Sequence, residues 1–307
     1  MNDSRLALAH ADSPPGRAAA DFVALTKPRI GGLVALSAFV GALLAAGPEA
    51  PLLRVAEAAL LVASTAASAS VLNQVLERDV DARMLRTRGR PLPAGRVSMR
   101  DAILFGAALA VIGVGGLAWR FNLLSALLAS STLFVYTGIY TPLKRASTLN
   151  TVIGALPGAA PPLLGYVALA GSTGGWAISM FAVVFTWQFP HFMAIAWLHR
   201  DDYRRAQLRM LPALPGCEGL AGRAAFAYAL ALLPVSLLPG ARGEAGIVTA
   251  LGAIALGAAY LGAAAWFAWR PAERSARLLL VASLLYLPLY FLVVLVDPVV
   301  GVGILHG

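Results

Sequence analysis

The sequence is poor in cysteine and in charged residues. Cys217 is the only cysteine among 307 residues, which excludes an intrachain disulfide and a cysteine-cluster metal site. Charged residues make up 13% of the chain and hydrophobic residues 59%, and the mean hydropathy is +0.75. These values exclude an ordinary soluble domain of this length and indicate a membrane protein.

Apolar runs of about twenty residues recur along nearly the whole chain. Each run is long enough to cross a hydrocarbon core of about 30 Å as an α-helix. The predicted fold class is therefore all-α, a polytopic membrane protein with about nine transmembrane helices. The expected spans are 29–47, 55–76, 101–119, 122–142, 149–171, 175–198, 222–240, 245–269 and 276–296.

The ends of the chain differ from its middle. Residues 1–26 are polar and lack the apolar core of a secretory signal, so we expect a disordered cytoplasmic tail there. Residues 27–298 form the expected transmembrane domain, and residues 299–307 form a short external tail.

Basic residues gather in alternate loops. With the N-terminus in the cytoplasm, 21 of the 24 Lys and Arg residues lie on the cytoplasmic side, and only Arg54, Arg120 and Arg242 lie opposite. We therefore expect a multi-pass protein of the bacterial cytoplasmic (inner) membrane with its C-terminus outside. The formal net charge of +9 does not indicate nucleic-acid binding, because it is distributed in this alternating way.

A polar stripe lies where the second span reaches the membrane surface. Asn73, Glu77 and Asp81 follow at four-residue steps, which places them nearly in line on a helix. Oxygen ligands suit Mg²⁺, which binds through one or two carboxylates together with phosphate oxygens. We interpret the three residues as candidate metal ligands and catalytic residues. The alternative is a solvated helix end.

Basic residues near this stripe indicate a diphosphate partner, because cations clamp phosphate oxygens. Positive-inside anchoring is the alternative for those in the loop after the fourth span, and it is the stronger interpretation for Lys27 and Arg29. The candidates are Arg86, Arg88 and Arg90, followed by Lys144 and Arg145, with Tyr140 beside them as a catalytic candidate.

A second polar cluster crosses the end of the sixth span. His191 lies in an otherwise apolar span, where an ionisable side chain is costly and marks a functional candidate. A hydrogen-bonded structural histidine is the alternative. His199 follows about two turns later, where histidines also face helix carbonyls. Asp201 and Asp202 are candidate metal ligands, unless the neighbouring arginines neutralise them.

Both long cytoplasmic loops open with acidic residues at a helix end, as though one helical unit were used twice. Pro157, Pro161 and Pro162 should kink or interrupt the fifth span, which a membrane tolerates where the helix faces a cavity. We expect a central cavity open to the cytoplasmic side, with an apolar space behind it. This arrangement favours ionisation of an allylic diphosphate and attack on the carbocation by an electron-rich acceptor.

The motifs resemble those of UbiA-type intramembrane prenyltransferases, with Asn73, Glu77 and Asp81 in the places of the first aspartate-rich signature. The strings LTKPRI, RTRGRPLPAGRVS and, above all, WQFPHFMAIAWLHRDDY resemble the protohaem IX farnesyltransferase (haem O synthase) branch. The resemblance runs from about Leu25 to the last span. It implies nine transmembrane helices, Mg²⁺, and transfer of the farnesyl group of farnesyl diphosphate to a vinyl group of haem B with addition of water.

The resemblance also implies roles for individual residues. Arg86, Arg88 and Arg90 match the basic run beside the diphosphate, and His191 and His199 match the histidines of the second motif and contact haem. Where many relatives have a second Asp-x-x-x-Asp, this sequence has His191 and a displaced pair, Asp201 and Asp202. Haem A synthase or terminal-oxidase assembly proteins are the implied protein partners.

Two alternatives remain open at this point. The same fold with a quinone precursor or another acceptor is the nearest one. A membrane haem transporter or delivery protein would also carry intramembrane histidine and midspan prolines. A transport path should place polar residues deep within several spans, whereas the carboxylates here cluster at one face.

Overall fold

The computed structural model describes residues 15–46 and 51–299 and is built from helices. Within these ranges, nine helices are long and apolar enough to cross a membrane, as the sequence predicts. They are α3 (Pro28–Ala46), α4 (Leu52–Leu76), α6 through α7 (Met99–Arg120), α8 through α9 (Leu123–Ala146), α10 (Asn150–Ala170), α11 (Gly175–Leu198), α13 (Glu218–Ser236), α15 (Ile247–Trp269) and α16 (Glu273–Val296).

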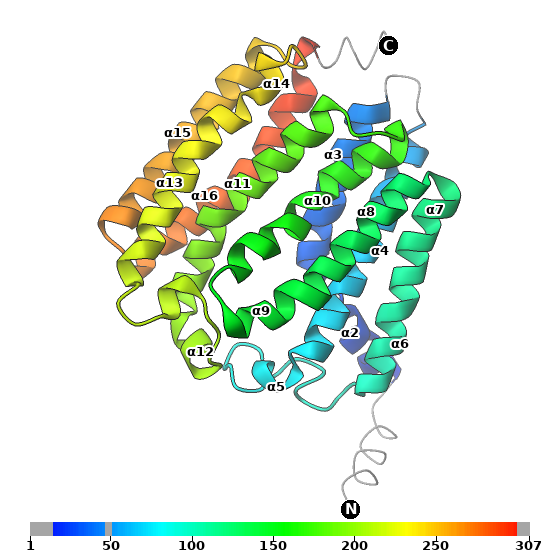
Figure 1. Ribbon diagram of the computed structural model, residues 1–307, viewed down its shortest axis with the longest axis vertical. Helices are drawn as coiled ribbons and strands as arrows, with labels where there is room; N and C mark the ends of the chain where they lie inside the picture. The colour runs from blue at the N-terminus through cyan, green and yellow to red at the C-terminus, as the bar shows by residue number, and fades with distance from the viewer. Residues whose placement is uncertain (1–14, 47–50, 300–307) are drawn as a thin grey trace, which may run out of the picture.

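The long helices lie side by side and run between two ends of the molecule (Figure 1). Helix α3 packs against α4 and α10, and α11 packs against α10, α13 and α16. The short helices α5 (Arg78–Asp81) and α12 (Arg200–Arg205) lie at the same end, whereas α14 (Leu238–Ala241) lies at the opposite end. The two loops that carry the predicted polar clusters therefore meet at one end of the bundle.

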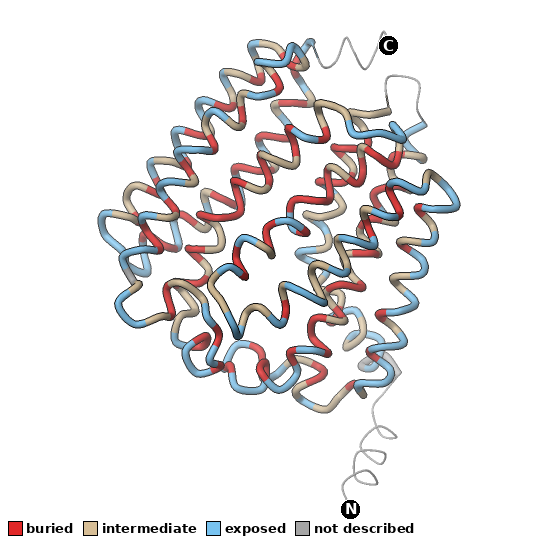
Figure 2. The backbone as a smooth tube through the Cα atoms, in the orientation of Figure 1, coloured by how far each residue is buried: buried red, intermediate tan, exposed pale blue. Residues whose placement is uncertain are grey.

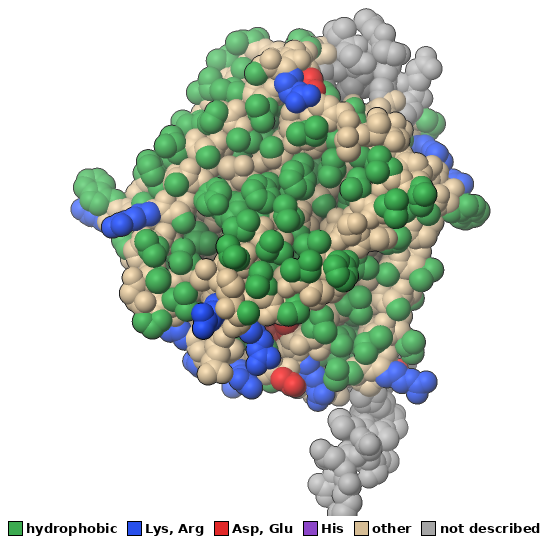
Figure 3. All heavy atoms as spheres, viewed as in Figure 1, with side chains coloured by type: hydrophobic (Ala, Val, Ile, Leu, Met, Phe, Trp, Pro, Cys, Tyr) green, Lys and Arg blue, Asp and Glu red, His purple; other side chains and the backbone are tan. Residues whose placement is uncertain are grey.

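The outer surface of the bundle is apolar. Buried residues follow the helix faces that meet inside (Figure 2), while Leu53, Trp119 and Trp269 are 81%, 85% and 83% exposed. Hydrophobic side chains cover the middle of one face, and basic side chains lie toward its edges (Figure 3). Such a surface is unfavourable in water and favourable in a hydrocarbon layer.

Helices α3 and α10 approach closely through small residues. A Cβ added to Gly41 would lie 1.9 Å from the carbonyl oxygen of Pro162, and one added to Gly165 would lie 1.9 Å from that of Ala38. Such close packing stabilises helix pairs in lipid. The prolines do not interrupt α10, which continues from Asn150 to Ala170 because its neighbours hold it in place.

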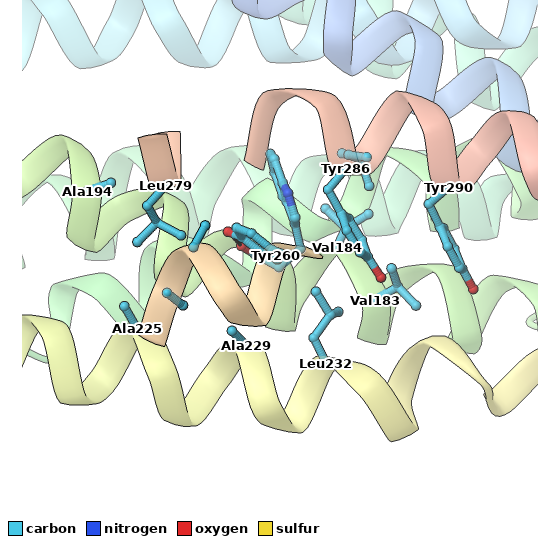
Figure 4. Close-up of a cluster of buried hydrophobic side chains, with 14 of the residues drawn as sticks. Val183, Val184, Ala194, Ala225, Ala229, Leu232, Tyr260, Leu279, Tyr286 and Tyr290 are labelled. Carbon is cyan, nitrogen blue, oxygen red and sulfur yellow. Dashed lines mark hydrogen bonds between the residues drawn. The ribbon is translucent and has the colours of Figure 1, made fainter. Parts of the chain in front are cut away.

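The opposite half of the bundle has an aromatic core. Tyr260, Tyr286 and Tyr290, from α15 and α16, pack with Val183 and Val184 of α11 (Figure 4). All five side chains are at most 3% exposed. This dense packing fixes α11 against the last two helices.

The expectation of a disordered N-terminal tail is wrong for residues 15–25, which form helix α2 (Pro15–Leu25). Asp21 accepts hydrogen bonds from Arg96 Nε at 3.0 Å, and the ring of Phe22 meets that of Phe105 edge-on. Leu25 is fully buried. These tertiary contacts hold α2 against the bundle. The expectations for residues 1–14 and 300–307 lie outside the described residues.

Candidate active site

A cavity of about 240 Å³ lies at the end of the bundle where α5 and α12 meet. Its walls carry charges of both signs, together with amide, hydroxyl and aromatic groups. The charged lining residues are Lys27, Glu77, Asp81, Arg86, Arg90 and Lys144, and the other polar or aromatic ones are Asn73, Tyr136, Tyr140, Asn150, Thr151, Phe192 and Tyr203.

Glu77 joins α4 to α5 and keeps the predicted stripe in line. Its backbone (φ −99°, ψ 8°) departs from the helix for one residue. Its N–H still donates to the Asn73 carbonyl at 2.9 Å, and its own carbonyl accepts from the Asp81 N–H at 2.7 Å. Asn73, Glu77 and Asp81 are therefore brought together, as the four-residue spacing predicts, and all three line the cavity.

Hydrogen bonds orient the Asn73 amide. Thr141 Oγ1 donates to the Tyr136 carbonyl at 2.8 Å, so its single hydrogen is in use. Its oxygen therefore accepts from Asn73 Nδ2, at 3.0 Å. Oδ1 accepts no hydrogen bond within the described part of the chain, so it can serve as an oxygen donor in the cavity that Asn73 lines.

Each cavity carboxylate is paired with a cation. Arg90 Nη1 lies 2.7 Å from Asp81 Oδ2, and Lys144 Nζ lies 2.9 Å from Glu77 Oε1. Lys144 Nζ also lies 4.4 Å from the centroid of the Tyr140 ring, close enough for a cation–π contact. The two ion pairs offset the negative charge of two carboxylates on side chains that are only 12% and 1% exposed.

Lys27 is a cavity residue for which the sequence favours a different role. It connects α2 to α3 with a left-handed backbone (φ 53°) and makes no ion pair within the described part of the chain. Burial lowers the pKa of Lys27 to about 8, with further lowering by Arg90 and Lys144 that Glu77 and Asp81 oppose. A single basic residue before a span also fits membrane anchoring, so only the fold reveals this position.

The basic residues predicted to bind diphosphate divide into two groups. Arg86, Arg90 and Lys144 line the cavity. Arg88 is exposed and is not among the lining residues, and Arg145 borders a separate open hollow on the surface. Alternate members of the run from Arg86 to Arg90 thus face different surroundings.

The second acidic pair does not line the cavity. The Asp201 side chain is 69% exposed and pairs with Arg204 at 3.3 Å. Asp202 accepts a hydrogen bond from the Leu85 N–H at 3.0 Å and pairs with Arg205. Burial alone would raise the pKa of Asp202, but these hydrogen bonds lower it overall. Asp202 thus ties α12 to the loop after α5.

The two predicted histidines also lie outside the cavity lining. His191 Nδ1 lies 2.8 Å from Ser283 Oγ of α16, and Trp187 stacks against the imidazole ring with centroids 5.1 Å apart. Its neighbour Phe192 does line the cavity. His199 ends α11, where burial and the nearby Arg86 lower its pKa and favour the neutral form.

A second, apolar cavity of about 130 Å³ adjoins the first. The two share Ile30 and Tyr136 as lining residues. The apolar cavity continues between α3, α4, α8 and α10, past side chains such as Val62 and Leu164. An apolar chain attached to a group in the charged cavity can therefore extend into the bundle.

Several lining residues carry no signal that sequence reasoning used. Tyr136 is one of them; it shares a π-helical segment, Val135–Tyr140, with Tyr140, which the sequence does predict as a site residue and which also lines the cavity. π-helical turns are frequent at functional sites. Such a turn has no simple sequence pattern. Asn150 begins α10, where polar residues are common, and Tyr203 lies within the short helix α12.

Sequence comparison identifies a family for most of the chain. The profile of the UbiA prenyltransferase family matches residues 34–287. The protoheme IX farnesyltransferase of Solibacter usitatus is 40% identical over 288 residues, covering 90% of this chain and 98% of the relative. The protoheme IX farnesyltransferase of an Anaeromyxobacter species is 43% identical over 276 residues, covering 89% and 92%.

Solved structures show the same fold. A structure of digeranylgeranylglyceryl phosphate synthase has a TM-score of 0.75 at 16% identity and covers 94% of this chain and 99% of its own. A UbiA homologue from Archaeoglobus fulgidus bound to DMAPP and Mg²⁺ has a TM-score of 0.64 at 18% identity, covering 90% and 99%. At these identities the similarity concerns the fold.

Proposed function

The chain belongs to the UbiA prenyltransferase family, and on that premise we propose that it transfers the farnesyl group of farnesyl diphosphate to a vinyl group of haem B. Water adds in the same reaction, and the products are haem O and diphosphate. The observation that carries this proposal is 40–43% identity, over about nine tenths of the chain, to relatives named protoheme IX farnesyltransferase. The charged cavity beside an apolar one supports it.

We propose that Glu77 and Asp81 hold Mg²⁺, with Asn73 Oδ1 as a further donor. Two carboxylates and an amide oxygen fit the preference of Mg²⁺ for a few protein oxygens plus water and phosphate. The described residues contain no group of three His, Cys, Asp or Glu side chains arranged for a metal ion, so diphosphate oxygens would complete the shell. Bound Mg²⁺ would neutralise the charge that develops on the departing diphosphate.

The two ion pairs define what must change when substrate binds. Glu77 and Asp81 bind Lys144 and Arg90 in the described structure. The arriving diphosphate would accept Lys144 and Arg90, and Glu77 and Asp81, freed of these partners, would hold Mg²⁺. Lys27 and Arg86 line the same cavity and add positive charge around the phosphate oxygens. Mg²⁺ and diphosphate should therefore bind together more tightly than either binds alone.

The same residues support the bond changes. The bond between farnesyl C1 and the diphosphate oxygen breaks, and its electron pair leaves with diphosphate. The terminal vinyl carbon of haem B attacks C1, the positive charge moves to the inner vinyl carbon, and water adds there with loss of a proton. Tyr136, Tyr140 and Phe192 surround the cavity with aromatic rings, which stabilise a cation and limit early access of water.

We place the end of the bundle that carries α5 and α12 at the cytoplasmic surface of the bacterial inner membrane. The loops at this end hold most of the basic residues, which is typical of the cytoplasmic side. The diphosphate then enters from the cytoplasm. The farnesyl chain extends past Ile30 and Tyr136, which line both cavities, into the apolar one.

The test is product formation by the purified chain in detergent with haem B, farnesyl diphosphate and Mg²⁺. Mass analysis of the extracted haem should show a hydroxyethylfarnesyl product that is absent without farnesyl diphosphate. A parallel reaction with a quinone precursor covers the nearest alternative acceptor. Folded protein that binds haem but never modifies it would contradict the proposal.

A further inference from the structure

Ser283, on the last helix, lies against the imidazole of His191. We propose that Ser283 is a positioning residue that holds His191 as its Nδ1–H tautomer, so that Nε2 is free to bind the iron of the haem acceptor. This inference rests on the proposed function, which supplies haem B as the acceptor. It also gives a role to the WQFPHF string, whose Trp187 and His191 do not line the charged cavity.

The tautomer follows from counting hydrogens. Ser283 Oγ donates its single hydrogen to the Leu280 carbonyl at 2.6 Å, within α16. It therefore has only lone pairs to offer to His191 Nδ1, 2.8 Å away. Nδ1 must be the donor, and in a neutral imidazole Nε2 then carries the lone pair.

Neighbouring groups also fix the plane of the ring. Trp187 stacks on His191 with an interplanar angle of 21°, and its own Nε1 donates to the Ser283 carbonyl at 2.9 Å. Tyr260 donates to the Trp187 carbonyl at 3.1 Å and belongs to the buried core shown in Figure 4. Three helices, α11, α15 and α16, thus hold the imidazole in one orientation.

Nε2 remains available to a ligand. It makes no hydrogen bond in the part of the chain that the structure describes, and His191 is only partly buried. The buried side-chain atoms without a partner there belong to Ser179, Glu244, Thr249 and Tyr286, and not to His191. Nε2 is therefore not one of the fully enclosed atoms that lack a partner.

This arrangement is the one that metal-binding histidines adopt. A histidine that binds a metal through one ring nitrogen usually donates the other N–H to a nearby acceptor, and loss of that acceptor weakens binding about 10- to 100-fold. Haem iron accepts neutral imidazole as an axial ligand. Phe192 and Ile195, one and four residues further along α11, line the charged cavity. A macrocycle held at His191 therefore lies beside the farnesyl donor.

The experiment compares haem binding to the detergent-solubilised full chain and to four variants. These are Ser283→Ala, Ser283→Thr, His191→Ala and, as the control, Ser236→Ala. Ser236 is fully buried and donates within its own helix to the Leu233 carbonyl, as Ser283 does to Leu280, but no histidine bonds to it. The readouts are haem affinity and the optical and resonance Raman signatures of iron–histidine coordination.

We expect an iron–histidine signature in the wild-type chain and in Ser236→Ala, and its loss in His191→Ala. Ser283→Ala should bind haem about tenfold more weakly, with mixed coordination, and Ser283→Thr should restore the signature. An unchanged signature in Ser283→Ala or in His191→Ala overturns the inference. If those variants still form haem O, the proposed function stands without it. If the wild-type chain neither binds nor modifies haem, the proposed function fails as well.

Discussion

The junction after α4 and the junction after α11 share one backbone arrangement and differ in side chains. Glu77 (φ −99°, ψ 8°) and His199 (φ −114°, ψ 18°) each end a long helix and begin a short one. Each donates its N–H to the carbonyl four residues earlier, in Asn73 and Ile195 respectively. The weak internal repeat predicted from the acidic loops thus has a counterpart in the backbone.

Aligning the two junctions explains why only one of them gathers carboxylates. The first junction places Asn73 and Asp81 in the cavity, and the equivalent positions of the second place Ile195 and Tyr203 there. The acidic residues of the second junction are out of phase, because Asp201 is equivalent to Asp79 and Asp202 to Val80. Asp79 and Asp201 are both exposed. The first junction therefore contributes an amide and carboxylates to the cavity wall, and the second contributes apolar and aromatic side chains.

The largest effect should come from the carboxylates that the first junction places in the cavity. Asp81→Asn removes one of two proposed metal carboxylates, and we expect haem O formation to fall by about 10²- to 10³-fold. Its Mg²⁺ requirement should rise. Asp79→Asn, two residues away and exposed, is the matched control and should stay within about twofold. Equal losses in both variants, or an unchanged Mg²⁺ dependence in Asp81→Asn, would contradict the assignment.

The next largest effect concerns the exchange of partners by Lys144. Lys144→Gln removes the cation paired with Glu77, so activity should fall by about 10- to 100-fold while Mg²⁺ alone binds more tightly. Calorimetry with Mg²⁺ and with inorganic diphosphate separates the two effects. Arg145 borders the surface hollow and not the cavity, so Arg145→Gln should change neither the Mg²⁺ affinity nor the diphosphate affinity. Weaker Mg²⁺ binding in Lys144→Gln would argue against exchange.

A smaller effect should appear in the pH dependence of diphosphate binding, through Lys27. Its pKa is lowered from 10.5 to about 8, so affinity should fall by up to about tenfold per pH unit above 8 as the charge is lost. Between pH 8 and 10.5 the unfolded chain binds this proton and the folded chain does not, so this group makes the fold more stable as pH rises.

Two variants and one control test the assignment to Lys27. Lys27→Met should remove the pH dependence above 8, and Lys27→Arg should keep high affinity to higher pH because arginine stays protonated. Arg29→Gln in the same string alters an exposed residue that does not line the cavity. It should therefore retain the wild-type profile. A profile that Lys27→Met leaves unchanged would assign the titration to another group.

The smallest effect should come from the second junction. Asp202→Asn weakens the links to Leu85 and Arg205, so we expect a loss of about 1–2 kcal/mol in stability. Activity should fall only a few-fold. Asp201→Asn removes an exposed ion pair, so the free energy of unfolding should stay unchanged within measurement error. Thermal unfolding and Mg²⁺ titration measure both variants. A large rise in the Mg²⁺ requirement of either variant would support a second metal site at this junction.

Prediction from sequence succeeded where one physical rule dominates. The nine spans follow from the length and apolarity that a hydrocarbon core demands, and the stripe from Asn73 to Asp81 follows from helical spacing. It was less successful where the fold changes a side chain's surroundings. Helix α2 is fixed by contacts such as the one between Asp21 and Arg96, which lies 75 residues away in the chain. Arg88 and Arg145 look like Arg90 and Lys144 in sequence but lie outside the cavity.

The sequence by itself determined the membrane environment, the all-α class and the candidate chemistry, because hydrophobicity and residue type act locally. The tertiary structure alone decided which polar side chains share one space. It brought Lys27 and Lys144 beside Glu77 and Asp81, and it turned His191 toward Ser283. These placements depend on how separate helices pack and where their ends break, and no spacing within a single segment encodes such relations.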